Sequence, residues 1–219
     1  MKIAIISDTH SLLRDEVMEK IRECEIILHG GDITSKETME AIEKLGRTYF
    51  VRGNADKDWA EDIPYEKEIE ICGYRFYMVH KKSDIRKDLS GIDFVIFGHS
   101  HKYEERTEGN ITYLNPGSCG PRRFTQPVTL MIMEIEKDRT WKIEKIDLSP
   151  VLKAGAKLPP LKEMDIIIKN IVKDMNANKT VDKIAQRNRV DKALVEEILQ
   201  IYTTHPGIDV DGILNRINH

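Results

Sequence analysis

The sequence contains no long uninterrupted stretch of apolar residues. Its first apolar run, Ile3 to Ile6, gives way at once to Ser7, Asp8 and His10, which makes it too short for the apolar region of a signal peptide. No later segment approaches the roughly 18 apolar residues that a membrane-spanning helix requires. We therefore expect a cytoplasmic protein that has no membrane partner.

Cysteine is also scarce. The three cysteines, Cys24, Cys72 and Cys119, are odd in number and never form a CxxC pair. This pattern argues against a disulfide framework and against a thiolate zinc site. We expect all three cysteines to be reduced and structural.

Net charge is small as well. The 34 lysines and arginines nearly balance the 37 aspartates and glutamates, and the formal net charge is −3. Such a charge creates no global field that would attract nucleic acid or an anionic membrane, so any binding of a polyanion must come from local features.

Up to about residue 148, short apolar runs alternate with helical stretches, which predicts an α/β fold. Helices are expected at Leu12–Glu23 and Lys36–Leu45 in a βαβαβ beginning, and antiparallel runs follow Trp59. The expected strands are Lys2–Ser7, Glu25–Leu28, Thr48–Val51, Glu66–Ile71, Tyr74–Val79, Ile92–Phe97, Ile111–Leu114, Val128–Glu136 and Trp141–Leu148. We expect these strands to form two packed sheets with helices outside.

A second domain follows a linker. Three prolines and a glycine within residues 149–161 indicate the linker, so residues 1–148 and 162–219 are expected to form two domains. Helical segments are expected at Met164–Met175, Val181–Arg187, Asp191–Tyr202 and Val210–Ile217. The second domain is therefore predicted to be entirely helical.

Side chains of the types that bind divalent cations follow five of the expected strands. They are Asp8 and His10, then Asp32, then Asn54, then His80, and finally His99 and His101. The two-residue spacing of Asp8 and His10 would point both the same way from an extended backbone. Each motif alone is typical of an ordinary turn or a packed histidine. Their joint occurrence at strand ends predicts a hydrolytic metal site.

These motifs, with Asn115-Pro116-Gly117-Ser118 and Pro121-Arg122, resemble those of the calcineurin-like metallophosphoesterases, and within them the small YfcE-type phosphodiesterases. The resemblance covers about residues 1–148 and implies a four-layer α/β/β/α sandwich of two mixed sheets. By position it implies that Asp8, His10, Asp32 and His101 hold one metal, and that Asp32, Asn54, His80 and His99 hold the other. Asp32 would then bridge the two cations.

The resemblance also implies a mechanism. A carboxylate shared by two cations about 3.5–4 Å apart offsets their repulsion, and a metal-bridging hydroxide attacks phosphorus in line with the leaving oxygen. Asp32, Asn54 and His80 would be the catalytic residues. We expect two divalent ions, in the first place Mn²⁺, while Fe, Ni, Mg and Zn stay open because oxygen and nitrogen ligands suit several ions.

The sequence departs from the family pattern at two places. Ala55 stands where many relatives have a histidine that protonates the leaving group, so the proton must come from another source. Around His80 the chain reads Val-His-Lys-Lys where the family usually shows Thr-His-Gly-His. Lys81 or Lys82 is then either a phosphate contact or a solvated surface residue.

Other polar residues have weaker signals. His29 is interpreted as a packing residue, and Asn115 and Ser118 as parts of a structural turn. Arg122 and Arg123 are candidate substrate-binding residues, because guanidinium groups suit bidentate contacts to phosphate. A plain surface role is the alternative for both arginines.

The C-terminal domain resembles a helix-turn-helix in spacing, with Ile184-Ala185, Val190, Val195 and Ile198 at core positions. Arg189 replaces the usual small residue at the tight turn. Basic and acidic residues are equal in number over residues 162–219, a poor footprint for DNA. We therefore favour binding of a protein or formation of a homo-oligomer over binding of nucleic acid, with plain structural capping as a further alternative. We expect no part for this domain in the chemistry.

Three functional hypotheses remain. The first is a dinuclear phosphodiesterase that acts on a small phosphodiester. The second is a non-catalytic metal-binding scaffold of the same fold that acts in protein assembly. The third is an enzyme tethered to nucleic acid or to a partner by its helical domain. All seven candidate ligand positions hold competent side chains, which favours an enzyme.

Overall fold

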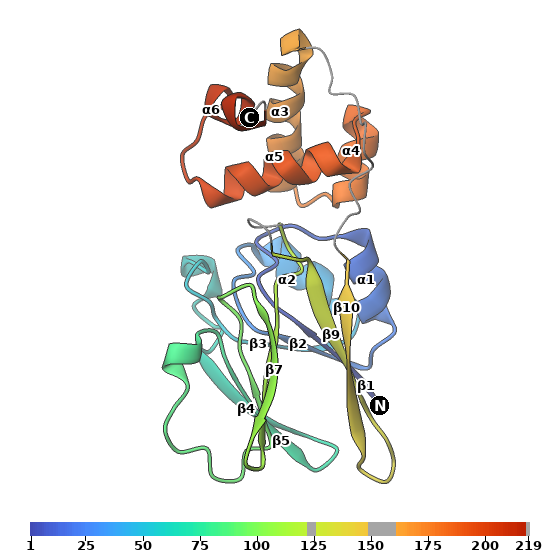
Figure 1. The fold of residues 1–219 in the computed structure, drawn as a ribbon, viewed down its shortest axis with the longest axis vertical. Coiled ribbons are helices and arrows are strands. Elements are labelled where there is room, and N and C mark those ends of the chain that lie inside the picture. Colours follow the sequence, from blue (N-terminus) through green and yellow to red (C-terminus); the bar gives the residue numbers. More distant parts are fainter. Residues whose placement is uncertain (122–125, 149–160, 218–219) are drawn as a thin grey trace.

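The computed structural model describes residues 1–121, 126–148 and 161–217. Two five-stranded sheets make up the first part of the chain, and α-helices make up the last part, stacked against one end of the sheets (Figure 1). This arrangement confirms the expected α/β sandwich followed by a helical domain.

The first sheet has the strand order β10-β9-β1-β2-β3. Its central strands β1, β2 and β3 are parallel, and β9 and β10 add to β1 in antiparallel pairing. The strands are β1 (Lys2–Ile6), β2 (Ile26–His29), β3 (Arg47–Phe50), β9 (Thr129–Ile135) and β10 (Trp141–Asp147).

The second sheet has the order β4-β5-β6-β8-β7 and is also mixed. Its strands are β4 (Glu66–Ile71), β5 (Tyr74–Val79), β6 (Phe94–Ile96), β7 (Tyr103–Glu108) and β8 (Ile111–Pro116). The sequence did not predict β7. This strand lies at a sheet edge, where it pairs with β8, and an edge strand that faces solvent needs no apolar alternation.

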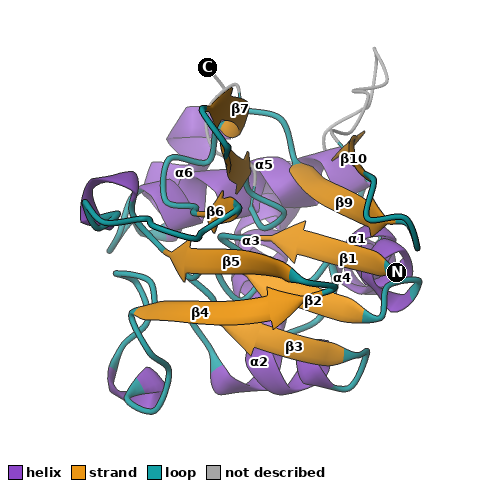
Figure 2. Ribbon diagram, turned by 90° about the horizontal axis from the view of Figure 1, so that it is seen from below, coloured by secondary structure: helices purple, strands orange, loops and turns teal. Residues whose placement is uncertain are grey.

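Apolar side chains separate the layers, and Figure 2 shows the two sheets one over the other. Inward-facing residues such as Ile5, Phe76 and Ile96 pack between the sheets. Helices α1 (Asp15–Arg22) and α2 (Lys36–Glu43) cover the outer face of the first sheet. The outer face of the second sheet is covered by the loop after the 3-10 turn η2 (Lys82–Asp84), through Ile85 and Leu89. The fourth layer is therefore thinner than a layer of α-helices.

Helix α1 begins later than its apolar spacing predicted. The expected helix started at Leu12, but the chain turns at His10 and Ser11, both of which have positive φ. Leu12 packs in the apolar cluster of the helical domain, and the Arg14 side chain is buried. Contacts with a distant segment therefore override local helix propensity here.

The helical domain comprises α3 (Leu161–Asn176), α4 (Val181–Asn188), α5 (Lys192–Thr204) and α6 (Val210–Ile217). Ile184, Val195 and Ile198 are buried in its core, as the helix-turn-helix-like spacing predicted. Arg189 ends α4 in the left-handed conformation, with φ of 55°. A long side chain is thus accommodated at the tight turn between α4 and α5.

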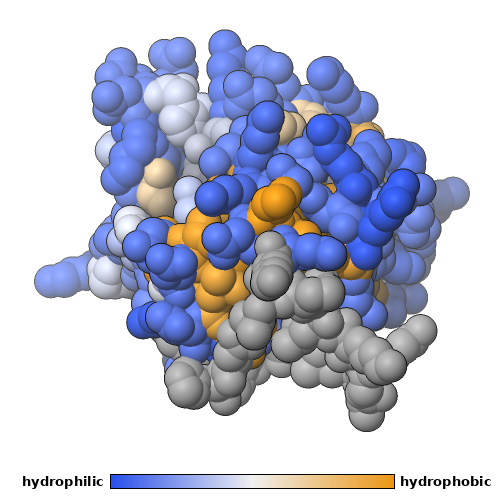
Figure 3. Space-filling model, turned by 90° about the horizontal axis from the view of Figure 1, so that it is seen from above, coloured by the Kyte–Doolittle hydropathy of each residue, from blue (hydrophilic) through white to orange (hydrophobic). Residues whose placement is uncertain are grey.

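The end of the molecule that the helical domain forms is mostly hydrophilic, with a confined apolar area (Figure 3). The expected linker, residues 149–161, lies outside the described residues except for Leu161, which begins α3. Within the described ranges, no helix combines the length and apolar content needed to cross a membrane.

Candidate metal centre

The candidate ligands gather where strands of both sheets end. They are Asp8 and His10 after β1, Asp32 after β2, His80 after β5, and His99 and His101 after β6. β1 is parallel to β2, and β5 is parallel to β6, so the carboxyl ends of each pair lie at one sheet edge. The topology therefore brings residues from distant parts of the chain together.

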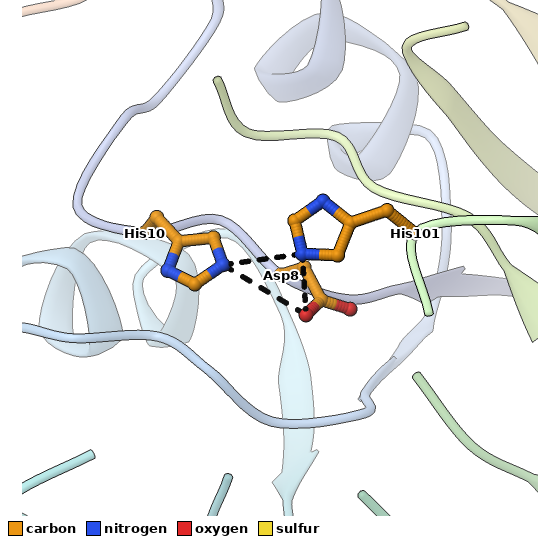
Figure 4. Close-up of side chains that lie close together, drawn as sticks. All are labelled: Asp8, His10 and His101. Carbon is orange, nitrogen blue, oxygen red and sulfur yellow. Dashed lines mark hydrogen bonds and ion pairs between the residues drawn. The ribbon is translucent and has the colours of Figure 1, made fainter. Parts of the chain in front are cut away.

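Asp8, His10 and His101 form the first donor group (Figure 4). All three are buried, and their ligand atoms lie within 4.8 Å of one another. Asp8 Oδ1 lies 3.1 Å from His101 Nε2 and 3.8 Å from His10 Nε2, and the two imidazole nitrogens are 3.4 Å apart. One carboxylate oxygen and two imidazole nitrogens thus converge, a donor set that suits a divalent cation.

Asp32, His80 and His99 form the second donor group, again with ligand atoms within 4.8 Å. Asp32 Oδ2 lies 3.4 Å from His80 Nε2, and the His80 and His99 rings meet edge to face at a centroid distance of 5.2 Å. The same Asp32 Oδ2 lies 3.8 Å from His10 Nε2 of the first group. The Asp32 carboxylate therefore reaches histidines of both groups.

Within the described residues, two ligand atoms of the donor groups form no hydrogen bond and face only the other donors. Asp8 Oδ2 accepts from Ser7 Oγ (2.6 Å) and from the His99 backbone N–H (3.1 Å), whereas Asp8 Oδ1 has no hydrogen bond within the described residues. His80 Nδ1 bonds to the Gly30 carbonyl oxygen at 2.7 Å, which orients the ring, and His80 Nε2 is likewise without a hydrogen bond there. Buried polar atoms normally have partners. A cation would supply them, so these residues fit a metal.

The backbone of the site is unusual. Asp8, His10, Asp32, His99 and His101 all have φ between 44° and 67°. The left-handed region is sparsely populated by residues other than glycine, and such strained positions cluster at functional sites. The extended backbone predicted for Asp8 and His10 is therefore wrong, and the two side chains converge because the chain turns at each residue.

The carboxylates and histidines of the site shift one another's pKa values toward the charged forms. Burial alone would raise the pKa of Asp8, but the close His101 imidazole and the other nearby histidines outweigh it and hold that pKa well below its usual range. The pKa of Asp32 is lowered in the same way, against burial, chiefly by His80. Burial opposes protonation of His80, yet Asp32 and Asp8 raise its pKa. Both carboxylates are therefore ionised at neutral pH, where they attract cations.

Asp56 supports the site from behind, a role that the sequence analysis missed. Its carboxylate accepts hydrogen bonds from the backbone N–H groups of Asp32 (3.0 Å), Thr34 (2.7 Å) and Gly53 (2.8 Å). The loops after β2 and β3 are thereby joined through one buried side chain. An aspartate three residues after Gly53 was the available signal, because short acidic side chains often accept from nearby backbone in turns.

His29 is a packing residue, as expected. Its Nδ1 accepts from the Gly31 backbone N–H (3.1 Å), and its Nε2 lies 3.1 Å from Thr9 Oγ1. A ring nitrogen that accepts a hydrogen bond carries no proton, so the ring is neutral. Burial accordingly lowers the pKa of His29 to about 3.

We expect the metal-free protein to lose stability through His29 as the pH falls below its ordinary pKa of 6.5. Between pH 6.5 and about 3 the unfolded chain binds a proton that the folded chain does not, so the free energy of unfolding decreases with falling pH, by at most ~1.4 kcal/mol per pH unit. Urea unfolding at several pH values measures this slope. In His29→Gln, whose amide can donate to Thr9 but does not titrate, the slope should be smaller. Equal slopes would assign the effect to other groups.

Two further residues hold the loops of the site. Asn115 Nδ2 donates to the Gly98 carbonyl oxygen (2.9 Å), and Ser118 Oγ donates to the Asp8 carbonyl oxygen (2.9 Å). These bonds confirm their interpretation as structural residues. Lys82 pairs with Glu104 at 2.7 Å, so it is committed to a surface ion pair.

The predicted roles of three further site residues, Asn54, Arg122 and Arg123, are not tested by the structure. The Asn54 side chain is exposed, and it lies beside Ala55, whose backbone N–H donates to Asp32 Oδ1 at 2.7 Å. Its role as a ligand stays a prediction. Arg122 and Arg123 lie outside the described residues, so their contact with substrate also stays a prediction.

Comparison with known proteins gives concordant results. Residues 1–138 match the model of the calcineurin-like phosphoesterase superfamily domain. A probable metallophosphoesterase of Methanothermobacter thermautotrophicus is 31% identical over 170 residues, which cover 71% of this chain and 94% of the relative. A phosphodiesterase of Methanocaldococcus jannaschii is 29% identical, over 63% of this chain and 95% of its own length. The structure of Vps29 from Entamoeba histolytica complexed with Zn²⁺ superposes with a TM-score of 0.52 at 22% identity, over 67% of this chain and 99% of its own, and shows a shared fold.

Proposed function

This chain belongs to the calcineurin-like phosphoesterase superfamily, and we propose that it is a phosphodiesterase that hydrolyses small phosphodiesters with two divalent cations. The observation that carries the proposal is the presence of two donor groups side by side, with Asp32 Oδ2 close to a histidine of each group. A relative that is 29% identical over 95% of its length is a phosphodiesterase, which supports the reaction class.

The proposed ligand sets follow the donor groups. Asp8, His10, Asp32 and His101 would hold one cation, and Asp32, Asn54, His80 and His99 would hold the other. Two bound cations supply Lewis acidity, because they lower the pKa of a water and neutralise charge on the phosphoryl oxygens. We propose Mn²⁺ for both positions, although the same oxygen and nitrogen donors also suit Fe, Ni, Mg and Zn.

The protein itself positions charge for this reaction. Ser7 and the His99 backbone N–H fix one oxygen of Asp8, so the other faces the donor group. The bond from His80 to the Gly30 carbonyl presents Nε2. His99 is the exposed member of the second group, so substrate would approach from its side. No protein nucleophile is needed in this scheme.

The alternative is a non-catalytic scaffold of the same fold. A scaffold has no need of a complete donor set, yet Asp8, His10, Asp32, His80, His99 and His101 all lie in the two groups. Buried ligand atoms that form no hydrogen bond in the described part of the chain also favour a working metal site. We therefore place catalysis ahead of assembly.

Elemental analysis and hydrolysis of bis(4-nitrophenyl) phosphate test the proposal. We expect two metal ions per chain, loss of turnover after chelation and recovery with added Mn²⁺. Bound metal without turnover on aryl and nucleotide phosphodiesters would favour the scaffold. A protein that binds no metal would contradict both functions.

The side chain at position 55 should determine how strongly the hydrolysis rate depends on the leaving group. Ala55 cannot donate a proton, so rates should depend steeply on the pKa of the leaving group, with nitrophenyl esters cleaved far faster than alkyl esters. Ala55→His should flatten this dependence, because an imidazolium there can protonate the leaving oxygen. Ala55→Gln, which is similar in size but donates no proton, is the control. A flat dependence in the parent protein would show that another group supplies the proton.

A further inference from the structure

Arg14 heads the fully buried side chains in size among the described residues. It lies in the loop after β1 that carries Asp8 and His10 (residues 7–14, the β1 loop). Its guanidinium Nη1 donates to Glu196 Oε1 of α5, and Arg14 and Glu196 are only 1% and 4% exposed. A buried ion pair is weak support for stability in itself, because desolvation offsets the attraction. Stability alone therefore does not explain why this ion pair is buried.

The Arg14 guanidinium also binds residues 118–120, a second segment next to the site. Arg14 Nε and Nη2 both donate to the Gly120 carbonyl oxygen, at 3.2 and 3.0 Å. Just before Gly120, Ser118 Oγ donates to the Asp8 carbonyl oxygen at 2.9 Å. Gly120 itself lies so close to the backbone of Asp8 and Thr9 that a Cβ would not fit. Through residues 118–120, Arg14 therefore constrains the position of the Asp8 backbone.

The helical domain contacts the β1 loop and the loop after β2 at further points. Leu12 of the β1 loop is 1% exposed and belongs to the apolar cluster of the helical domain. Asn178 Oδ1 accepts from Ser35 Oγ (3.0 Å) and Thr38 Oγ1 (3.1 Å) at the start of α2. The two loops are themselves joined by the bond from the His10 N–H to the Asp32 carbonyl oxygen (3.0 Å).

From these contacts we infer that Glu196 and Arg14 are positioning residues, through which the helical domain holds the β1 loop in its cation-binding conformation. The inference rests on the proposed metal site. Asp8 and His10 have left-handed backbone conformations, which persist only where the surrounding structure determines them. The β1 loop is bonded on one side to residues 118–120 and on the other to α5. The helical domain thus takes part in building the site, contrary to its expected separation from the chemistry.

Titration of Mn²⁺ into chelator-treated, full-length protein tests the inference by calorimetry. Glu196→Ala should weaken the binding step that belongs to Asp8, His10 and His101 at least about tenfold, the effect typical of lost support for metal ligands. The other step should change less than about threefold. His101→Ala removes a donor from the first group, so the binding step that it weakens is the one that belongs to that group. Glu197→Ala is the matched control, since it removes an exposed carboxylate from the next position of α5.

Arg14→Lys is the second variant, should Glu196→Ala fail to fold. Lysine keeps a cation for Glu196 but cannot reproduce the planar fork that also reaches Gly120, so the same binding step should weaken at least about threefold. If Glu196→Ala or Arg14→Lys lowered the melting temperature yet left both Mn²⁺ affinities as in the parent, the residues would be merely structural and the inference wrong. A parent protein that binds no Mn²⁺ would instead overturn the metal site on which the inference rests.

Discussion

Replacing Asp32 with asparagine should empty both donor groups and lower turnover of an aryl phosphodiester by about 10³-fold or more, roughly 4 kcal/mol of barrier. Asp32 Oδ2 lies 3.4 Å from His80 Nε2 and 3.8 Å from His10 Nε2, so its charge is available to a cation in either group. An amide would place there either an NH₂ group, which repels a cation, or an oxygen without a full negative charge.

Metal content and turnover, measured on the same preparation of Asp32→Asn, check this expectation and should fall together. Asp62→Asn is the matched control, because Asp62 is exposed and outside the two donor groups. A variant that kept two metals and full activity would show that Asp32 does not bridge. Loss of one metal alone would restrict Asp32 to a single ligand set.

Gly53→Ala should damage both the fold and the site. A Cβ at Gly53 would come closer than 3.0 Å to Asp32 Oδ1 and to the Asp32 backbone nitrogen, and a backbone atom cannot rotate away. Gly53 also donates its N–H to Asp56 at 2.8 Å, within the support of the Asp32 loop. We expect a loss of ~3 kcal/mol in the free energy of unfolding and, because Asp32 is displaced, about 10²-fold in turnover.

Urea unfolding and turnover at saturating Mn²⁺ measure the two losses in Gly53→Ala. Gly46→Ala is the matched control, because a Cβ there would meet the Cys24 carbonyl oxygen at 3.4 Å, an ordinary contact. Its stability should stay within ~1 kcal/mol of the parent, with unchanged turnover. Similar effects in the two variants would mean that close packing at Gly53 is unimportant for the site.

The donor side chains were predictable because their chemistry and their place after apolar strands are local properties of the sequence. Asp8, His10, Asp32, His80, His99 and His101 all appear in the two donor groups, whose membership the family resemblance, and not residue type alone, implied. Asp56 was missed because a buried carboxylate that serves only backbone N–H groups looks like any turn aspartate. Strand β7 was missed because an edge strand can be polar on both faces.

The order of most strands and helices, the helical nature of the C-terminal domain and the residue types available to a cation could all be predicted from the amino-acid sequence. Apolar spacing and side-chain chemistry, both short-range, were sufficient for this. In contrast, long-range packing takes Leu12 and Arg14 out of the predicted helix and buries Glu196 against Arg14, 182 residues away in the chain. It also decided the left-handed turns at Asp8 and His10. Such features arise from packing between distant segments, which no local spacing encodes.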